Sequence, residues 1–143
     1  MRLRFVFLGK TKRAECRSML DDYVSRTQRY ATIEITELRE DSAALKKFSI
    51  ESASAIVLLD AAGKNYSTPE FARWLGAHRD RGSSQELVFL CGGASGFPEE
   101  IRRLATTKLS LSSLTMPHEL AQVVLTEQIY RAFTILSGHP YSK

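Results

Sequence analysis

Cysteine, proline and long apolar segments are all scarce in this chain of 143 residues. Its two cysteines, Cys16 and Cys91, are too few for a disulfide framework, which favours a reducing, cytoplasmic compartment. No apolar run approaches the roughly 20 residues that span a bilayer, so we expect no membrane partner. The opening MRLRFVFLGK has only a short apolar stretch, interrupted by Arg4 and ended by Gly9. A first strand is therefore a better interpretation than a signal peptide.

The sequence also lacks the patterns of several catalytic and metal-binding sites. His78, His118 and His139 do not have the spacing of metal ligands, so we expect no metal site. Neither a GxSxG nucleophile elbow nor a Walker loop is present. Cys91 has no neighbour in sequence that would lower the pKa of its thiol, and we interpret it as a core residue. We interpret His118, just after a proline, as a helix-capping or core residue.

Positive charge, in contrast, is plentiful. The formal net charge is +4 and the isoelectric point is about 9.2. Much of the charge falls in the first thirty residues, at Arg2, Arg4, Lys10, Lys12, Arg13, Arg17, Arg26 and Arg29. Such a cluster fits either a solvated basic face or a surface that contacts the phosphates of a nucleic acid.

Apolar periodicity predicts strands that alternate with helices. We expect strands at residues 3–8, 32–38, 55–60, 86–91 and 109–112. We expect helices at about 13–27, at 41–54 (short and weak), from a capping box at 67–70 to Gly82, from Pro98 through Leu104, and from Pro117 to Gly138. This alternation predicts one α/β domain over residues 1–143, with a mostly parallel sheet and helices on both faces.

Three loops are expected beyond the carboxyl ends of the predicted strands, where such sheets bind ligands. They are residues 60–64, 92–96 and 112–115. The middle loop reads Gly-Gly-Ala-Ser-Gly after a strand (GGASG from Gly92), and glycine lets a backbone approach a ligand closely. The loop therefore indicates a nucleotide-like cofactor, with a tight strand-to-helix turn as the alternative.

The last predicted helix has an unusually wide apolar arc. Its apolar residues are Leu120, Val123, Val124, Leu125, Ile129, Ala132, Phe133 and Leu136. Such a helix is either deeply buried or shared with a second subunit. Glu127 and Arg131 stand one turn apart, as a helix-stabilising ion pair or as part of a site at a dimer interface.

Several motifs together resemble the smallest SPOUT methyltransferases, those of the RlmH type. The matching segments are Leu58-Leu-Asp-x-x-Gly-Lys64, Ser67-Thr-Pro69, Cys91-Gly-Gly-x-x-Gly96, Leu109-Ser-Leu-Ser-Ser-Leu-Thr-Met-Pro-His-Glu-Leu120, and Glu127-Gln-Ile-Tyr-Arg-Ala132 with His139-Pro-Tyr141. The resemblance implies methylation of N3 of a pseudouridine in large-subunit (23S) ribosomal RNA, with S-adenosyl-L-methionine as cofactor. It also implies a homodimer, a C-terminal trefoil knot, and a substrate within the large subunit or the whole ribosome.

The resemblance also implies which residues form the site. The cofactor-binding residues carried over are Leu59, Gly92, Leu111, Ser112, Ser113, Leu114, Thr115 and Met116. Methyl transfer to an imide nitrogen requires alignment and the loss of a proton. We predict Arg131, His139 and Tyr141 as catalytic residues, with Arg131 stabilising negative charge and the tail folding back toward the site. Tyr141 is expected to stack on a base.

Two features depart from the family pattern, and other functions stay open. Ser95 stands where the family usually has an acidic residue, which bears on the electrostatics of the cofactor loop. The segment 39–54 is shorter and less lysine-rich than usual, which bears on RNA contacts. The alternatives are a nucleotide-binding α/β protein without methyltransferase activity, a noncatalytic RNA-binding module, and a diverged relative with another RNA target.

Overall fold

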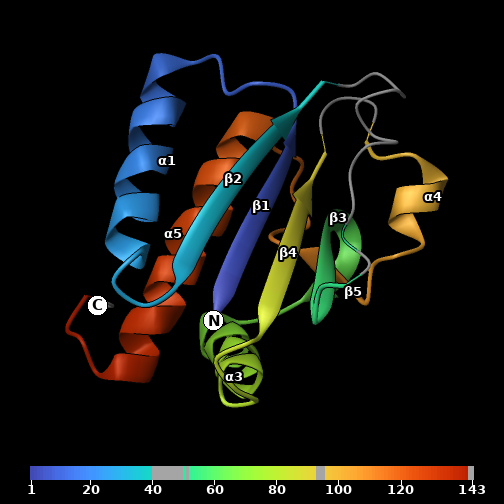
Figure 1. Cartoon of the computed structure of the whole chain (residues 1–143). Helices are drawn as coiled ribbons and strands as arrows, with labels where there is room; N and C mark the ends of the chain where they lie inside the picture. Colours follow the sequence, from blue (N-terminus) through green and yellow to red (C-terminus); the bar gives the residue numbers. More distant parts are fainter. Residues whose placement is uncertain (40–49, 51, 93–95, 142–143) are drawn as a thin grey trace.

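The computed structural model describes residues 1–39, 50, 52–92 and 96–141 (Figure 1). The elements in chain order are β1 (Arg2–Leu8), α1 (Ala14–Thr27), β2 (Thr32–Leu38), β3 (Ala55–Asn65), α3 (Thr68–Arg79), β4 (Glu86–Cys91), α4 (Glu99–Arg102), β5 (Thr107–Ser110) and α5 (His118–Ser137). The strands form one sheet in the order β2-β1-β4-β3-β5, and each neighbouring pair is parallel. The predicted α/β fold with a parallel sheet is confirmed.

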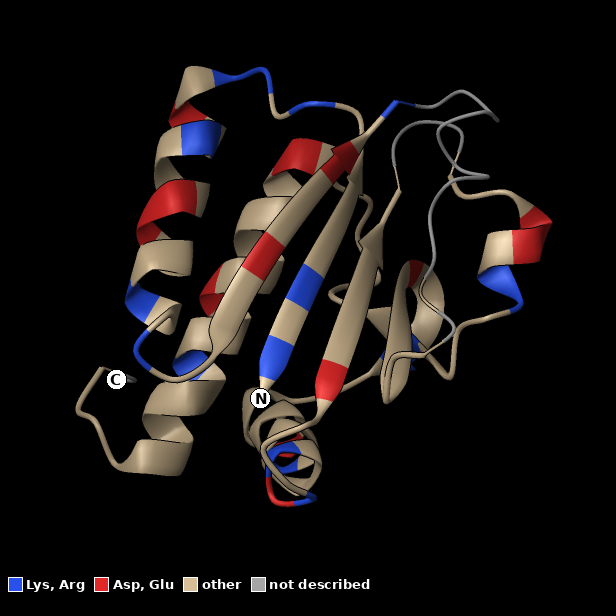
Figure 2. Ribbon diagram, viewed as in Figure 1, with Lys and Arg blue, Asp and Glu red and all other residues tan. Residues whose placement is uncertain are grey.

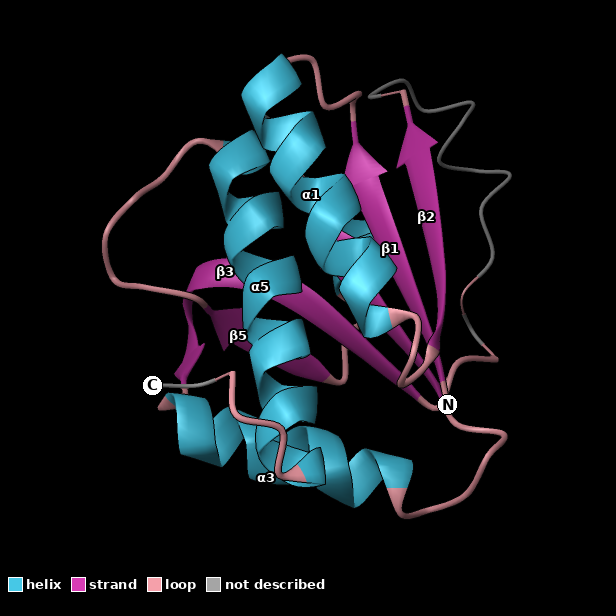
Figure 3. Ribbon diagram, turned by 90° about the vertical axis from the view of Figure 1, so that its left-hand side faces the viewer, coloured by secondary structure: helices cyan, strands magenta, loops and turns pink. Residues whose placement is uncertain are grey.

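The two faces of the sheet are covered unequally. Side chains alternate along a strand, so Leu3, Phe5 and Phe7 of β1 face one side while Val6 and Leu8 face the other. The first side packs against α1, α3 and α5, which lie together on that face (Figure 3). The second side packs against the short α4 and its flanking residues. Helices thus cover both faces, as predicted, but most of the helical mass lies on one.

Helix α5 is buried between α1 and α3 (Figure 3). Residues around most of its circumference are inaccessible, among them Val123, Leu125, Ile129 and Phe133. Leu120, at the start of the helix, stays 44% exposed. Burial within one chain therefore accounts for most of the wide apolar arc, and the arc does not by itself indicate a second subunit.

The helix ends follow from local chemistry. The capping box of α3 is confirmed, because Ser67 Oγ accepts from the Glu70 N–H at 3.2 Å and Glu70 Oε1 accepts from the Ser67 N–H at 3.3 Å. Helix α5 begins after Pro117, which caps it without a side-chain hydrogen bond. It ends at Gly138, whose φ of 75° is left-handed and favours glycine.

Some predicted boundaries were wrong. Strand β5 covers residues 107–110, not 109–112, because the chain turns at Ser110, whose Oγ donates to the Ser112 carbonyl at 3.1 Å. Helix α4 is a single turn and does not reach Leu104. Helix α3 ends at Arg79, before Gly82. Most of the helix expected at residues 41–54 lies outside the described residues.

The loop predicted at residues 60–64 is instead a bulge inside β3. Leu59 and Lys64 both pair with Leu109 of β5, so the residues between them leave the ladder. Asp60 Oδ1 accepts from the Ala62 N–H at 2.9 Å and closes this turn. A Cβ at Gly63 would lie 2.6 Å from the Lys108 carbonyl oxygen, so the close approach of β5 requires glycine there. Over the described residues, no helix is long and apolar enough to cross a membrane.

Candidate active site

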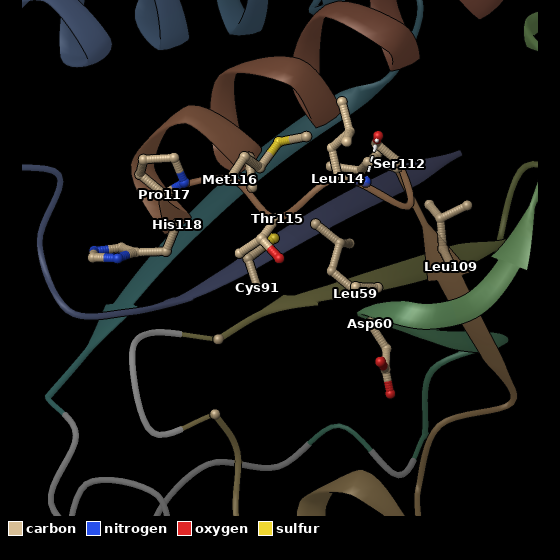
Figure 4. Close-up of a pocket in the computed structure, with 15 residues that line it drawn as sticks. Leu59, Asp60, Cys91, Leu109, Ser112, Leu114, Thr115, Met116, Pro117 and His118 are labelled. Atoms are coloured by element: carbon tan, nitrogen blue, oxygen red, sulfur yellow. Dashed lines mark hydrogen bonds between the residues drawn. The ribbon is translucent and has the colours of Figure 1, made fainter.

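A cavity of about 480 Å³ lies beside the bulge of β3 and beyond the carboxyl ends of β4 and β5 (Figure 4). Its lining residues are Leu59, Asp60, Ala61, Cys91, Gly92, Gly96, Leu109, Leu111, Ser112, Leu114, Thr115, Met116, Pro117, His118 and Ala121. Seven of the eight predicted cofactor residues are in this set, and Ser113 is not. The fold thus gathers three segments, distant in sequence, around one space, as ligand sites at such sheet edges are arranged.

The segment from Leu111 to Pro117 forms one wall of the cavity (Figure 4). Ser112 Oγ accepts from the Leu114 N–H at 3.0 Å, which holds the segment in a turn. Leu114 follows this turn and is 78% exposed. The wall is therefore built from small polar residues that turn the chain and apolar residues that line the space.

Gly92 is constrained by its own loop. A Cβ at Gly92 would lie 3.1 Å from the Gly96 Cα and 3.7 Å from the Phe97 ring. Glycine thus lets the two ends of the 92–96 loop approach each other. Residues 93–95, including Ser95, lie outside the described residues. A side chain at position 92 would therefore strain the loop at a point where it lines the cavity.

Asp60, Cys91 and His118 line the cavity but were not predicted as cofactor residues. Burial raises the pKa of the Cys91 thiol, so Cys91 stays protonated and belongs to the core, as expected. His118 is exposed at the cavity rim, and Pro117, not His118, caps α5. Its interpretation as a capping or core residue was therefore wrong. Asp60 belongs to the DxxGK motif, but the motif alone does not predict that it lines the cavity, because the bulge that brings it there depends on the pairing of β3 with β5.

The predicted ion pair between Glu127 and Arg131 is present. Arg131 Nε lies 3.1 Å and 3.2 Å from the two Glu127 carboxylate oxygens, and Nη2 lies 2.8 Å from Oε2. The hydrogen bond to Glu127 raises the pKa of Arg131. Gln128 Nε2 also donates to Glu127, at 2.9 Å. Glu127 is therefore the centre of a polar cluster on the outer side of α5.

The tail folds back onto α5, where it joins this cluster. Tyr141 donates its hydroxyl to Glu127 Oε2 at 3.0 Å, and its ring meets the Tyr130 ring edge-on at a centroid distance of 4.7 Å. The Arg131 guanidinium lies 4.9 Å from the Tyr141 ring centroid. Burial, together with hydrogen bonds, raises the pKa of Tyr141, so the phenol stays protonated. His139 is exposed, and its backbone N–H donates to the Thr134 carbonyl at 2.9 Å.

The cavity and the tail cluster, by which we mean Glu127, Arg131 and the tail residues His139 and Tyr141, lie at different positions along the axis of α5. The cavity contacts its first turn, at His118 and Ala121, whereas Arg131 lies ten residues further on. At 1.5 Å per residue this places Arg131 about 15 Å along the axis. Within one chain, the described structure does not bring Arg131, His139 or Tyr141 to the cavity, although the sequence grouped them into one site.

The basic N-terminal residues are mixed with acidic partners. Figure 2 shows both charges along α1. Arg17 pairs with Glu37 at 2.8 Å, whereas the Arg13 backbone N–H donates to Glu119 of α5 at 2.9 Å. The segment before α1, which contains Lys10 and Lys12, is thereby attached to the start of α5, whose first turn lines the cavity.

Comparison with known proteins agrees with this architecture. The family model described as "Predicted SPOUT methyltransferase" matches residues 1–142. The ribosomal RNA large subunit methyltransferase H of Koribacter versatilis is 43% identical over 143 residues, which cover 99% of this chain and 97% of the relative. The protein of that name from Geobacter sp. strain M21 is 40% identical over 152 residues, covering 99% and 98%.

Solved structures show the same fold at low sequence identity. The structure described as "a probable methylase family protein" from Haemophilus influenzae matches with a TM-score of 0.64 and 11% identity, over 99% of this chain and 70% of that chain. The structure described as "Probable Methyltransferase" from Bordetella pertussis matches with a TM-score of 0.61 and 11% identity, over 92% of this chain and 93% of that chain. The family resemblance inferred from the motifs is confirmed: the chain belongs to the SPOUT methyltransferase family.

Proposed function

We propose that this protein is an S-adenosyl-L-methionine-dependent methyltransferase that acts on N3 of a pseudouridine in large-subunit ribosomal RNA. Membership of the family supports the reaction class, and the name shared by its relatives, ribosomal RNA large subunit methyltransferase H, supports the substrate. The observation that carries the proposal is the cavity, because it gathers seven predicted cofactor residues from three segments of the chain. A cytoplasmic location agrees with the scarcity of cysteine.

The residues around the cavity fit the proposed cofactor. Its volume, about 480 Å³, falls within the roughly 300–1,000 Å³ of small-molecule sites. Gly92 lines the cavity without a side chain, and the apolar residues Leu59 and Leu111 suit a flat aromatic base. Leu59, Gly92 and the segment 111–116 would hold the cofactor, which supplies an electrophilic methyl group on a sulfonium when bound.

The tail cluster supplies the groups that act on the acceptor. An imide nitrogen must lose a proton, and the charge that develops must be stabilised. Arg131 is suited to stabilise that charge, and its hydrogen bonds to Glu127 fix its orientation. Tyr141 stays protonated and donates a hydrogen bond, so it does not serve as the base in this arrangement. His139 is then the candidate general base on the tail.

A complete site requires a second copy of the chain, and we include a homodimer in the proposal. The separation of the cavity and the tail cluster along α5 supports it, because a partner's tail can supply what one chain lacks beside its own cavity. Leu114 and Leu120, exposed at the same end of α5 as the cavity, add apolar surface for such contact. The trefoil knot implied by the resemblance is part of the same proposal.

Shared sites can be tested by complementation. A chain truncated after Ser137 and a full chain carrying Gly92→Val should each have little activity alone, the second when the cofactor concentration is well below the Kd of the variant. Coexpressed, they should recover about a quarter of the wild-type rate, since half of the randomly paired dimers are mixed and each has one complete site of two. No recovery, in mixed dimers shown by native mass spectrometry, would mean that each chain uses its own tail.

The substrate can be tested directly. Large-subunit RNA from cells with and without this protein should differ by one methyl group on a pseudouridine, detected by mass mapping. If the large-subunit RNA is unchanged, the remaining hypothesis is that this protein is a diverged member of the family that methylates another RNA. Binding of a different nucleotide, or salt-sensitive RNA binding without cofactor binding, would instead favour a protein that is not a methyltransferase.

The basic segment before α1, together with the first turn of α1, is our candidate for phosphate contacts. Replacing Arg13 and Arg17 with glutamine should weaken the binding of RNA of any sequence. The slope of the logarithm of RNA affinity against the logarithm of salt concentration should become shallower by at most about 2, while cofactor affinity is unchanged. Arg17 is already paired with Glu37, so Arg13 should account for most of the loss. The matched control replaces the exposed Arg79 and Arg81, and an equal effect of both pairs would remove the special role of this segment.

A further inference from the structure

Asp60 has an unusual position for a charged residue. Its side chain is only 24% exposed, and it lines the cavity from the bulge of β3 (Figure 4). Its Oδ1 accepts from the Ala62 N–H at 2.9 Å, which fixes the carboxylate on the bulge. The bulge itself is held by the pairing of Leu59 and Lys64 with one residue of β5. The carboxylate is therefore part of the rigid edge of the sheet.

The negative charge of Asp60 is only partly compensated. Among the lining residues in the described part of the chain, Asp60 alone is an acid, and the others are apolar, small, hydroxyl-bearing or, at His118, imidazole. Arg102 of α4 approaches Asp60 Oδ2 at 3.5 Å, a long contact, and is 40% exposed. Arg102 also lies 3.9 Å from Glu99, whose other carboxylate oxygen lies 3.5 Å from Arg103. The Asp60 carboxylate thus lines the cavity with only a long contact to its counter-charge.

We propose that Asp60 is a specificity residue that distinguishes the cationic methyl donor from its neutral thioether product, an inference that rests on the proposed function. S-adenosylmethionine and S-adenosylhomocysteine differ by the methyl group and the positive charge on sulfur. A fixed carboxylate in a partly desolvated cavity attracts the cation and gives the thioether no such stabilisation. Asp60 would therefore favour loading of the donor and release of the product without taking part in methyl transfer.

The structure offers an isosteric test. Asp60→Asn keeps an oxygen acceptor for the Ala62 N–H, so the bulge is retained while the charge is lost. By calorimetry, its Kd for S-adenosylmethionine should rise on the order of tenfold, whereas its Kd for S-adenosylhomocysteine should change less than about twofold. In the wild-type protein, the preference for the cation should fall as salt is added, because the rim is partly exposed.

Two further variants fix the sign of the effect. Arg102→Gln removes the counter-charge of Asp60, so the preference for S-adenosylmethionine should increase. Glu100→Gln is the matched control, because it removes an exposed acid from the same helix without touching the cavity lining, and its preference should equal that of the wild type. Thermal melting of each variant verifies that it is folded.

The outcomes separate this inference from the proposed function. Equal weakening of both ligands in Asp60→Asn, or no change in either, would overturn the specificity role while leaving the cofactor site in place. A decreased preference in Arg102→Gln would also contradict it. If the wild-type protein binds neither ligand, the proposed function fails and the inference fails with it.

Discussion

The two levels of α5 differ in how they are built. At its start, the wall of the cavity is made by backbone turns and small or apolar residues, such as Gly92, Ser112 and Thr115. Further along, Glu127, Arg131 and the tail form a dense cluster of ionic, hydrogen-bonded and aromatic contacts. One region has space for a ligand but few groups that move protons, and the other has such groups but not the cavity.

This difference suggests a division of work between the two regions. A cavity lined by backbone and fixed glycines can bind a cofactor tightly without reacting with it. Ionic groups held by one another can be presented to a substrate at a defined geometry. Changes in the cavity should therefore alter cofactor affinity, whereas changes in the tail cluster should alter turnover.

The largest expected effect comes from truncation after Ser137. The shortened chain loses His139 and Tyr141 and should lose methyl transfer by more than about a hundredfold. Its affinity for S-adenosylmethionine should stay within a few fold of the wild type, because the cavity lies at the other level of α5. Single-turnover methylation and calorimetry give the two values. Full turnover by the truncated chain would remove the tail from catalysis and leave Arg131 as the candidate.

Gly92→Val is the reciprocal change, on the cavity side. The added side chain would fill space beside the predicted cofactor and press on Gly96, so cofactor affinity should fall on the order of tenfold or more. Calorimetry measures the affinity, and a urea titration separates it from lost stability. An unchanged affinity in a folded variant would place the cofactor elsewhere.

Replacement by alanine should also affect stability differently at Gly63, in the bulge of β3, and at Gly76, which packs against the end of α5. A Cβ at Gly63 meets the Lys108 backbone at 2.6 Å, and Gly63→Ala should cost about 1–3 kcal/mol because backbone must move. A Cβ at Gly76 of α3 meets only the end of the Leu136 side chain, at 2.8 Å, which can rotate. Gly76→Ala also gains helix propensity of up to about 1 kcal/mol, so its net effect should be small. Urea unfolding of both variants tests the contrast, and an equal loss of stability would contradict it.

The loss of stability expected for Glu127→Gln is smaller than that expected for Gly63→Ala. The amide still accepts a hydrogen bond from Tyr141 but loses the ionic contact with Arg131, which is 26% exposed. The free energy of unfolding should fall by about 1 kcal/mol, as expected for a half-buried pair. Arg131→Gln should cost a similar amount, and the double variant should cost less than the sum. Additive losses would mean that the two side chains do not interact in solution.

The sequence predicted the secondary structure better than the site. Apolar runs such as those around Val57 and Phe89 identify buried parallel strands, and the capping box at Ser67 marks a helix start from local chemistry alone. The bulge that brings Asp60 to the cavity was not predictable, because it depends on the register with a strand far along the chain. The arc of α5 could not distinguish burial from dimerisation, since both require the same side chains. Arg131 and Tyr141 are neighbours as the motif suggested, but their distance from the cavity is a property of the fold.

The position of α5 in the chain has a consequence for folding kinetics. The helix follows strands β1 to β5 in sequence, yet it covers the face of the sheet formed by Leu3, Phe5 and Phe89. Until α5 docks, an emerging chain exposes this aromatic surface and has no wall for its cavity. Parallel strands pair across long stretches of sequence and therefore assemble slowly. The time before docking is thus the period of greatest risk of aggregation, and binding of a chaperone to the nascent chain should be strongest then.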